Sequence, residues 1–154
     1  MASINIRHVN EKDFVAIQAI KPSRTKESFE ENLLQQDKGD VEFLAVELDG
    51  ELVCYGILKW YGKPTHPEYP DLEDLYTKES ARGKGYATLL IKECERLVKA
   101  KGFTKLGMAA SIDPECAARR LYAKLGYLHD GKQQYVDGVY NGVEDWCIDL
   151  EKTL

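Results

Sequence analysis

The sequence predicts a single mixed α/β (α+β) domain, with one mostly antiparallel sheet and helices on both of its faces. Three observations lead to this prediction. The 154 residues suit one domain and are few for two. Segments of alternating apolar and polar residues, typical of strands, are interspersed with segments whose apolar residues recur every three or four positions, typical of helices. Aspartate–glycine and asparagine–glycine pairs predict tight turns between antiparallel strands.

The first residues predict a strand followed by two helices. Ile4–Val9 alternates apolar and polar side chains, so this strand should bury one face. Asn10 then caps a helix, Asp13 completes a partial capping box, and Pro22 ends the helix. A second helix is expected over residues 26–36, because the chain reaches a glycine shortly afterwards.

A hairpin and a further strand should follow. Residues 42–48 and 51–60 are expected to be strands, joined by the two-residue turn Asp49-Gly50. The next stretch is rich in proline and glycine and therefore predicts a loop. Asp71–Thr77 is expected to be the next strand of the sheet.

The clearest helix of the chain is expected over residues 85–101, because its apolar residues fall on one face. Residues 105–111 predict another strand. Asp113 is expected to cap the following helix, with Pro114 at its first position and Gly126 after its end.

Two closing strands complete the predicted sheet, around residues 128–136 and 144–150. Asp137-Gly138 and Asn141-Gly142 are the turn signals near them. The last two helices can join parallel strands through right-handed crossovers, whereas the hairpins require antiparallel neighbours. We therefore expect a mixed sheet of about six or seven strands, with four helices, in one domain over residues 1–154.

The composition excludes some classes of protein and disfavours others. Apolar residues make up 44% of the chain, too much for a disordered protein. The 21 basic and 26 acidic residues give a net charge of −5, which disfavours a nucleic-acid partner and favours a cationic small molecule. No apolar run approaches the ~18 residues that span a bilayer. The N-terminal residues lack the apolar core of a signal peptide, so we expect a cytoplasmic protein with no membrane partner.

The cysteines predict no metal site. They are too far apart for a CxxC pair, and no histidine lies near them at a ligand spacing. Reduced thiols in apolar surroundings are the expectation for all four: Cys54, Cys94, Cys116 and Cys147.

A glycine-rich turn, Arg82–Thr88, lies between a predicted strand and the clearest helix. Its small residues let a ligand approach the backbone, and the first turn of a helix offers unpaired amides with a partial positive charge. These features suit a pyrophosphate, and Arg82 and Lys84 add positive charge. The turn fits neither a dinucleotide fingerprint, which needs glycine at Thr88, nor the phosphate-binding loop of NTPases. An ordinary tight turn into a helix is the structural alternative.

Two motifs resemble those of the GNAT N-acetyltransferase superfamily. Arg82-x-x-Gly85-x-Ala87 is similar to its [QR]-x-x-G-x-[GA] motif, and residues 118–127, ARRLYAKLGY, are similar to its A-x-x-L-Y-x-K-x-G-[FY] segment. The order of the predicted elements also matches over nearly the whole chain. One departure is Glu115, where the family often has asparagine, which puts a side-chain contact to the coenzyme there in doubt.

The resemblance implies that the protein binds acetyl-CoA and needs no metal. The strands Asp71–Thr77 and 105–111 should splay apart, with pantetheine pairing along the backbone of the first and pyrophosphate lying on the amides of the glycine-rich turn. The residues implied for coenzyme binding are Leu75, Tyr76, Thr77, Arg82, Gly83, Lys84, Gly85, Tyr86, Ala87 and Thr88.

Acetyl transfer to an amine needs a base for the ammonium proton and an acid for the leaving thiolate. Tyr122 stands at the tyrosine of the second motif, which implies the acid, although a core aromatic residue is the alternative. The segment Leu72–Tyr76 resembles a strand of polyamine acetyltransferases in which the residue at Glu73 relays the proton through water. A solvated charge is the alternative for Glu73. Asp74 is the other candidate for the base. It should point to the opposite face of the strand, and the alternative for it is binding of substrate or of a backbone amide.

These features predict an N-acetyltransferase for a small, cationic primary amine. The alternatives are acetylation of a protein amino terminus or lysine, and a non-catalytic acyl-CoA binder. A homodimer through the last strand, Val143–Leu150, is also possible in such a protein. We expect the three histidines, His8, His66 and His129, to be surface or packing residues. Five aromatic residues either line the acceptor site or merely pack: Trp60, Tyr61, Tyr69, Tyr135 and Tyr140.

Overall fold

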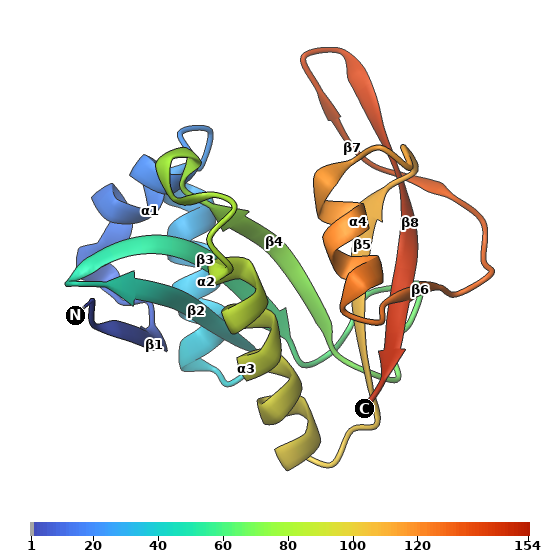
Figure 1. The fold of residues 1–154 in the computed structure, drawn as a ribbon, viewed down its shortest axis with the longest axis horizontal. Coiled ribbons are helices and arrows are strands. Elements are labelled where there is room, and N and C mark those ends of the chain that lie inside the picture. Colours follow the sequence, from blue (N-terminus) through green and yellow to red (C-terminus); the bar gives the residue numbers. More distant parts are fainter. Residues whose placement is uncertain (1) are drawn as a thin grey trace.

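The computed structural model describes residues 2–154 as one eight-stranded sheet with four α-helices (Figure 1). The spatial order of the strands is β1-β2-β3-β4-β5-β8-β6, and β7 also pairs with β8. Every neighbouring pair is antiparallel except β4 and β5, which are parallel, so the predicted mixed sheet is confirmed. The elements are β1 (Ile4–His8), α1 (Phe14–Ile20), α2 (Lys26–Asp37), β2 (Val41–Leu48), β3 (Glu51–Lys59), β4 (Asp71–Thr77), α3 (Tyr86–Ala100), β5 (Lys105–Ser111), α4 (Ala117–Lys124), β6 (Leu128–His129), β7 (Tyr135–Tyr140) and β8 (Val143–Thr153).

Helices cover both faces of the sheet, as the sequence predicted (Figure 1). Strand β2 shows why, because successive side chains of a strand point to opposite faces. Phe43 and Ala45 pack in the core beneath α1 and α2, whereas Leu44 and Val46 pack in the core beneath α3. Within residues 2–154, no helix combines the length and the hydropathy needed to cross a bilayer.

Local signals in the first third of the chain are confirmed. Asn10 and Asp13 form a reciprocal capping box, although the first turn is a short 3-10 helix, Glu11–Asp13, that leads into α1. Asp49 and Gly50 have φ angles of 49° and 85°, as a two-residue turn between β2 and β3 requires.

Strands β4 and β5 diverge, as the resemblance implied. They pair only at Asp71 with Gly107 and at Leu72 with Met108. Beyond these residues the two ribbons separate (Figure 1), so β5 does not pair with the later residues of β4 within the described chain. A parallel pair that opens in this way leaves backbone donors and acceptors for a bound molecule.

A β-bulge lies in β4 at the point of divergence. Two of its residues, Asp74 and Leu75, lie opposite a single residue of β3, Gly56. Asp74 has a φ of 50°, in the left-handed region that is uncommon for residues other than glycine. A bulge increases the local twist and redirects the side chains that follow it.

The predicted start of the fourth helix is wrong. Helix α4 begins at Ala117, with Cys116 as its N-cap, rather than at Pro114. Asp113 instead closes a separate turn, because its Oδ1 accepts from the Glu115 amide at 2.9 Å and its carbonyl accepts from the Cys116 amide at 3.1 Å. Aspartate before proline favours such a turn as readily as a helix N-terminus.

The predicted strand over residues 128–136 is also wrong in its extent. Only Leu128–His129 pair there, as β6, and β7 begins at Tyr135, which brings the strand count to eight. Asp137 and Gly138 lie inside β7 at a register shift, not in a turn. The extra residue of this bulge explains the turn-like composition of the pair. Asn141-Gly142 forms the turn between β7 and β8, as predicted.

Candidate active site

Two cavities lie along the diverging strands. The first, here called the α3 cavity, has a volume of about 540 Å³ and is lined by the end of β4, the glycine-rich turn, the start of α3 and one face of α4. The second, the hairpin cavity, has a volume of about 860 Å³ and lies between the α1–α2 turn, β4, β5 and the β7–β8 hairpin. Ala118 and Tyr122 of α4 line both cavities, so the two spaces meet at this helix.

The α3 cavity brings together nine of the ten residues that the sequence assigned to coenzyme binding. Lys84 is the exception, because it is exposed and does not line the cavity. The nine are Leu75, Tyr76, Thr77, Arg82, Gly83, Gly85, Tyr86, Ala87 and Thr88.

The start of α3 presents free amides to this cavity. The first intrahelical bond runs from the Leu89 amide to the Gly85 carbonyl, and no side chain caps the helix. The preceding helical amides thus have no intrahelical partner and carry the positive end of the helix dipole. Gly83 and Gly85 have φ angles of 77° and 87°, and nothing lies within 4 Å of a Cβ built on either. The loop therefore leaves open space in which an anion can approach its backbone.

Arg82 is held at the mouth of the α3 cavity. Its Nε donates to the Thr77 carbonyl at 3.1 Å, and its guanidinium lies 5.3 Å from the centroid of the Tyr76 ring. The remaining guanidinium nitrogens are free to meet a phosphate, for which arginine has a favourable geometry.

Tyr122 lines both cavities and is largely buried. Its side chain is 7% exposed, and no group in residues 2–154 hydrogen-bonds its hydroxyl. Burial raises the pKa of Tyr122 to about 12, so the phenol stays protonated at neutral pH. The residue is therefore both buried and in contact with two cavities, which the alternative of a simple core aromatic residue does not require.

Glu73 lines the hairpin cavity and forms an ion pair with Lys59, with 2.5 Å between Oε2 and Nζ. Burial opposes the charge on Lys59, but the pairing with Glu73 outweighs it and raises the pKa of Lys59.

Asp74 corrects one expectation from the sequence. Consecutive strand residues should point to opposite faces, yet Glu73 and Asp74 both line the hairpin cavity. The bulge and the positive φ of Asp74 break the alternation. The Asp74 carboxylate accepts from Lys21 Nζ at 2.5 Å, Arg24 Nη1 at 2.8 Å and the Tyr55 hydroxyl at 2.7 Å.

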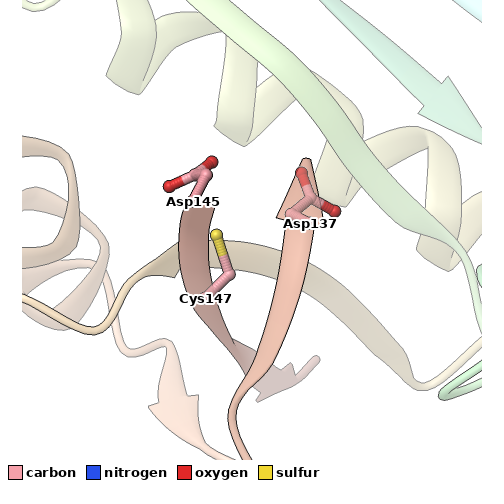
Figure 2. Close-up of side chains that lie close together, drawn as sticks. All are labelled: Asp137, Asp145 and Cys147. Carbon is pink, nitrogen blue, oxygen red and sulfur yellow. The ribbon is translucent and has the colours of Figure 1, made fainter. Parts of the chain in front are cut away.

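The β7–β8 hairpin supplies the far wall of the hairpin cavity. Figure 2 shows Asp137, Asp145 and Cys147 close together, and their potential ligand atoms lie within 4.8 Å of one another. The Lys63 ammonium lies 4.0 Å from Asp137, so a cation already faces this group. These three residues, which lie beside an ammonium group, are fewer than the four ligands that a structural zinc site needs.

The other histidine and aromatic candidates have mainly structural positions. His66 is fully buried, with Nε2 3.0 Å from Asp71 Oδ1, so it is a packing residue. Trp60 stacks on Phe103, outside both cavities. Of the five aromatic candidates, Tyr140 alone lines the hairpin cavity as the structure describes it.

Glu115 lies outside both cavities. Its side chain is exposed, and the nearest cation is Arg120, at 3.9 Å. This position agrees with the expectation that the Glu115 side chain does not contact the coenzyme.

Several residues of the hairpin cavity were missed by sequence reasoning. Lys21 and Arg24 come from the α1–α2 turn, Lys63 from the proline-rich loop, and Asp145 from β8. No motif or spacing in the sequence singled out these four residues. The burial of Arg24, which only the structure shows, indicates that it is paired, because an arginine that is 7% exposed needs an anionic partner.

Comparisons with known proteins agree with this fold. The acetyltransferase (GNAT) family model matches residues 5–127. The chain is similar in fold to an N-acetyltransferase from Staphylococcus aureus Mu50, with 22% identity, a TM-score of 0.79 and 98% of each chain covered. It is also similar to a ribosomal-protein-alanine N-acetyltransferase from Brucella melitensis, with 20% identity, a TM-score of 0.80, and 97% of this chain and 99% of that chain covered.

A third similar structure is YncA of Salmonella typhimurium, a putative acetyltransferase with its cofactor acetyl-CoA. It shares 18% identity, with a TM-score of 0.75 over 99% of this chain and 94% of that one. No curated protein matches the chain. The family match covers most of the chain and includes both motif segments, so the protein belongs to the GNAT family of acetyl-CoA-dependent N-acetyltransferases.

Proposed function

We propose that the protein transfers the acetyl group of acetyl-CoA to a primary amine of a small cationic acceptor, by direct attack in a ternary complex. One observation carries the proposal: Tyr122 and Ala118 border both cavities. Two substrates bound in separate spaces meet at this point, and no nucleophile of the protein has to take up the acetyl group first.

The α3 cavity suits the coenzyme. The free amides at the start of α3 and the guanidinium of Arg82 would hold the pyrophosphate. The backbone of Leu75, Tyr76 and Thr77, which β5 does not pair, would hold the pantetheine arm as an added strand. Acetyl-CoA supplies the activated acetyl group, and this placement directs its thioester toward Tyr122.

Glu73 and Tyr122 have the properties that the two proton transfers need. Glu73 is a carboxylate in the lining of the hairpin cavity, so it can accept the ammonium proton of the acceptor through a water molecule. The nitrogen then forms a bond to the acetyl carbon as the carbon–sulfur bond breaks. Tyr122 is protonated over the neutral range and can give its proton to the leaving sulfur. We therefore propose Glu73 as the base and Tyr122 as the acid.

The charges of the hairpin cavity favour a cationic acceptor. The cavity is lined by four carboxylates and three cations: Glu73, Asp74, Asp137 and Asp145 against Lys21, Arg24 and Lys63. Within the described residues, Asp145 has no ion-pair partner. Lys59 balances Glu73 from outside the lining, so the unpaired carboxylate of Asp145 is the group that attracts an ammonium and repels a carboxylate-bearing acceptor. The resemblance of Leu72–Tyr76 to polyamine acetyltransferases also favours an aliphatic amine.

A panel of amines tests the proposal. The purified protein is mixed with acetyl-CoA and one acceptor at a time, and the release of free thiol is followed. The panel contains butylamine, short diamines, spermidine, basic amino acids, and peptides with a free amino terminus or an internal lysine. We expect saturable thiol release with at least one small cationic amine. Faster acetylation of the peptides than of every small amine would contradict the proposed acceptor class, and no turnover with tight acetyl-CoA binding would contradict catalysis.

A further inference from the structure

We propose that Asp74 is a positioning residue, which holds the turn between α1 and α2 in place as a wall of the acceptor space. The inference rests on the proposed function, because it takes the hairpin cavity as the place where the amine binds. It assigns to Asp74 a role distinct from that of Glu73, the adjacent carboxylate in the same cavity.

Asp74 joins two parts of the protein that are distant in sequence. Its Oδ1 accepts from Lys21 Nζ at 2.5 Å, and its Oδ2 accepts from Arg24 Nη1 at 2.8 Å and from the Tyr55 hydroxyl at 2.7 Å. Tyr55 belongs to β3, next to the bulge, whereas Lys21 and Arg24 belong to the α1–α2 turn. The carboxylate therefore ties this turn to the sheet at the bulge.

The buried guanidinium of Arg24 requires the ion pair with Asp74. Its side chain is 6% exposed, and in the described chain Asp74 is the one carboxylate paired with it. Its Nη2 donates to the Ser28 carbonyl at 3.2 Å and to the Asn32 side chain, which fixes the start of α2 relative to the turn. A buried guanidinium without a counter-ion is unfavourable, so the turn keeps this conformation only while the Asp74 carboxylate is in place.

The turn forms one wall of the hairpin cavity. Lys21, Ser23, Arg24 and Ser28 all line it, on the side opposite the β7–β8 hairpin. If the turn moved, this wall would move with it, whereas the α3 cavity shares none of these residues. Loss of the Asp74 carboxylate should therefore weaken binding of the amine and leave binding of acetyl-CoA unchanged.

Asp74 is poorly suited to be the base. Its two oxygens already accept three hydrogen bonds, and protonation would disrupt the contacts with two cations. Glu73 has one ionic partner in the described chain. A positioning role and a base role therefore predict different kinetics for variants of Asp74.

Two variants separate the carboxylate from the backbone conformation. Asp74→Gly keeps the positive φ without strain and removes the carboxylate, and Asp74→Asn also tolerates this φ but loses only the charge. For a good small-amine acceptor, we expect Asp74→Gly to raise the KM of the amine by about tenfold or more, with kcat changed less than about threefold. Asp74→Asn should have a smaller effect on KM. The Kd of acetyl-CoA, measured by calorimetry, should not change in either variant.

Asp49→Gly is the matched control. Asp49 has a φ of 49°, nearly that of Asp74, but it lies in the exposed β2–β3 turn far from both cavities. The control should keep wild-type kinetics. A large fall in kcat with an unchanged KM for Asp74→Gly would indicate that Asp74 acts as the base instead. Unchanged kinetics would also overturn the proposal.

Limited proteolysis tests the tie without any acceptor. Trypsin cleaves after arginine, but Arg24 is buried, so the Arg24–Thr25 bond should resist cleavage in the wild type. We expect Asp74→Gly to be cut at this bond at least about tenfold faster, with Asp49→Gly as resistant as the wild type. Equal resistance of all three proteins would overturn the inference.

The two readouts distinguish this inference from the proposed function. If no amine is acetylated by the wild type, the proposed function fails, but the proteolysis still decides whether Asp74 holds the turn. If Asp74→Gly does not fold, Lys21→Met is used, because Lys21 is partly exposed and contributes one of the three contacts. It should raise the KM of the amine about threefold and speed cleavage after Arg24, and the absence of both effects would contradict the proposal.

Discussion

Removal of the Tyr122 hydroxyl should slow catalysis without weakening the fold. In the described chain this hydroxyl has no hydrogen-bond partner, so Tyr122→Phe breaks no internal bond. The free energy of unfolding should therefore change by less than about 1 kcal/mol. A positioned proton donor contributes typically ~10²-fold to the rate, so kcat should fall by about that factor, equivalent to about 2.7 kcal/mol.

Tyr127→Phe is the matched control for this variant. Tyr127 lies just after the end of α4, is 1% exposed, and donates to Glu95 at 2.8 Å. Its hydroxyl bonds a charged group, so its removal should lower the free energy of unfolding by about 1–3 kcal/mol and leave kcat unchanged. The two variants should therefore have opposite effects. Tyr122→Phe should lower kcat without changing the free energy of unfolding, and Tyr127→Phe should lower the free energy of unfolding without changing kcat.

The assay is thiol release with a saturating amine, together with urea denaturation and the Kd of acetyl-CoA. The pKa of Tyr122 of about 12 implies that its ionisation produces no alkaline limb between pH 6 and pH 9. A fall in kcat smaller than about threefold, with coenzyme binding intact, would remove Tyr122 from the role of acid. A similar loss of kcat in Tyr127→Phe would show that the assay reports stability instead.

Three further predictions follow from the geometry. Gly85→Val should weaken acetyl-CoA binding much more than Gly85→Asn, because asparagine tolerates a φ of 87° and a β-branched residue does not; equal Kd values would contradict this. Gly107→Ala should destabilise the protein by about 1–3 kcal/mol in urea denaturation, because the added Cβ lies 2.8 Å from the His66 ring; a stability equal to the wild type would be the contrary result. Burial raises the pKa of Asp71 to about 7, and in His66 the bond to Asp71 outweighs burial and raises its pKa too. At this pair the folded state therefore binds more protons than the unfolded state between about pH 4 and pH 7, so the contribution of the pair to the free energy of unfolding should fall as pH rises through this range. Asp71→Asn should reduce that slope between pH 5 and pH 7, and an unchanged slope would exclude the pair as its cause.

The coenzyme half of the site was predictable because its signals are local. The glycine-rich turn, the strand Asp71–Thr77 and helix α3 all lie within a single stretch of the sequence, and β4 has the predicted bounds residue for residue. The start of α4 was not predictable from capping rules, because Asp113 satisfies a turn equally well. The hairpin cavity is lined by six separate segments, and no local pattern states that Lys21 will meet Asp74.

The bulge in β4 explains how one strand serves both halves of the site. A regular strand would place Glu73 and Asp74 on opposite faces, and only one of them would reach the acceptor space. The bulge turns both toward the hairpin cavity, and the next residues, Leu75 and Tyr76, then line the α3 cavity. A residue other than glycine with a positive φ costs of order 1–3 kcal/mol, and the three donors that bind the Asp74 carboxylate offset this cost. The same carboxylate thus stabilises the bulge and the α1–α2 turn. A substitution of Asp74 should therefore affect binding of the amine more than binding of the coenzyme.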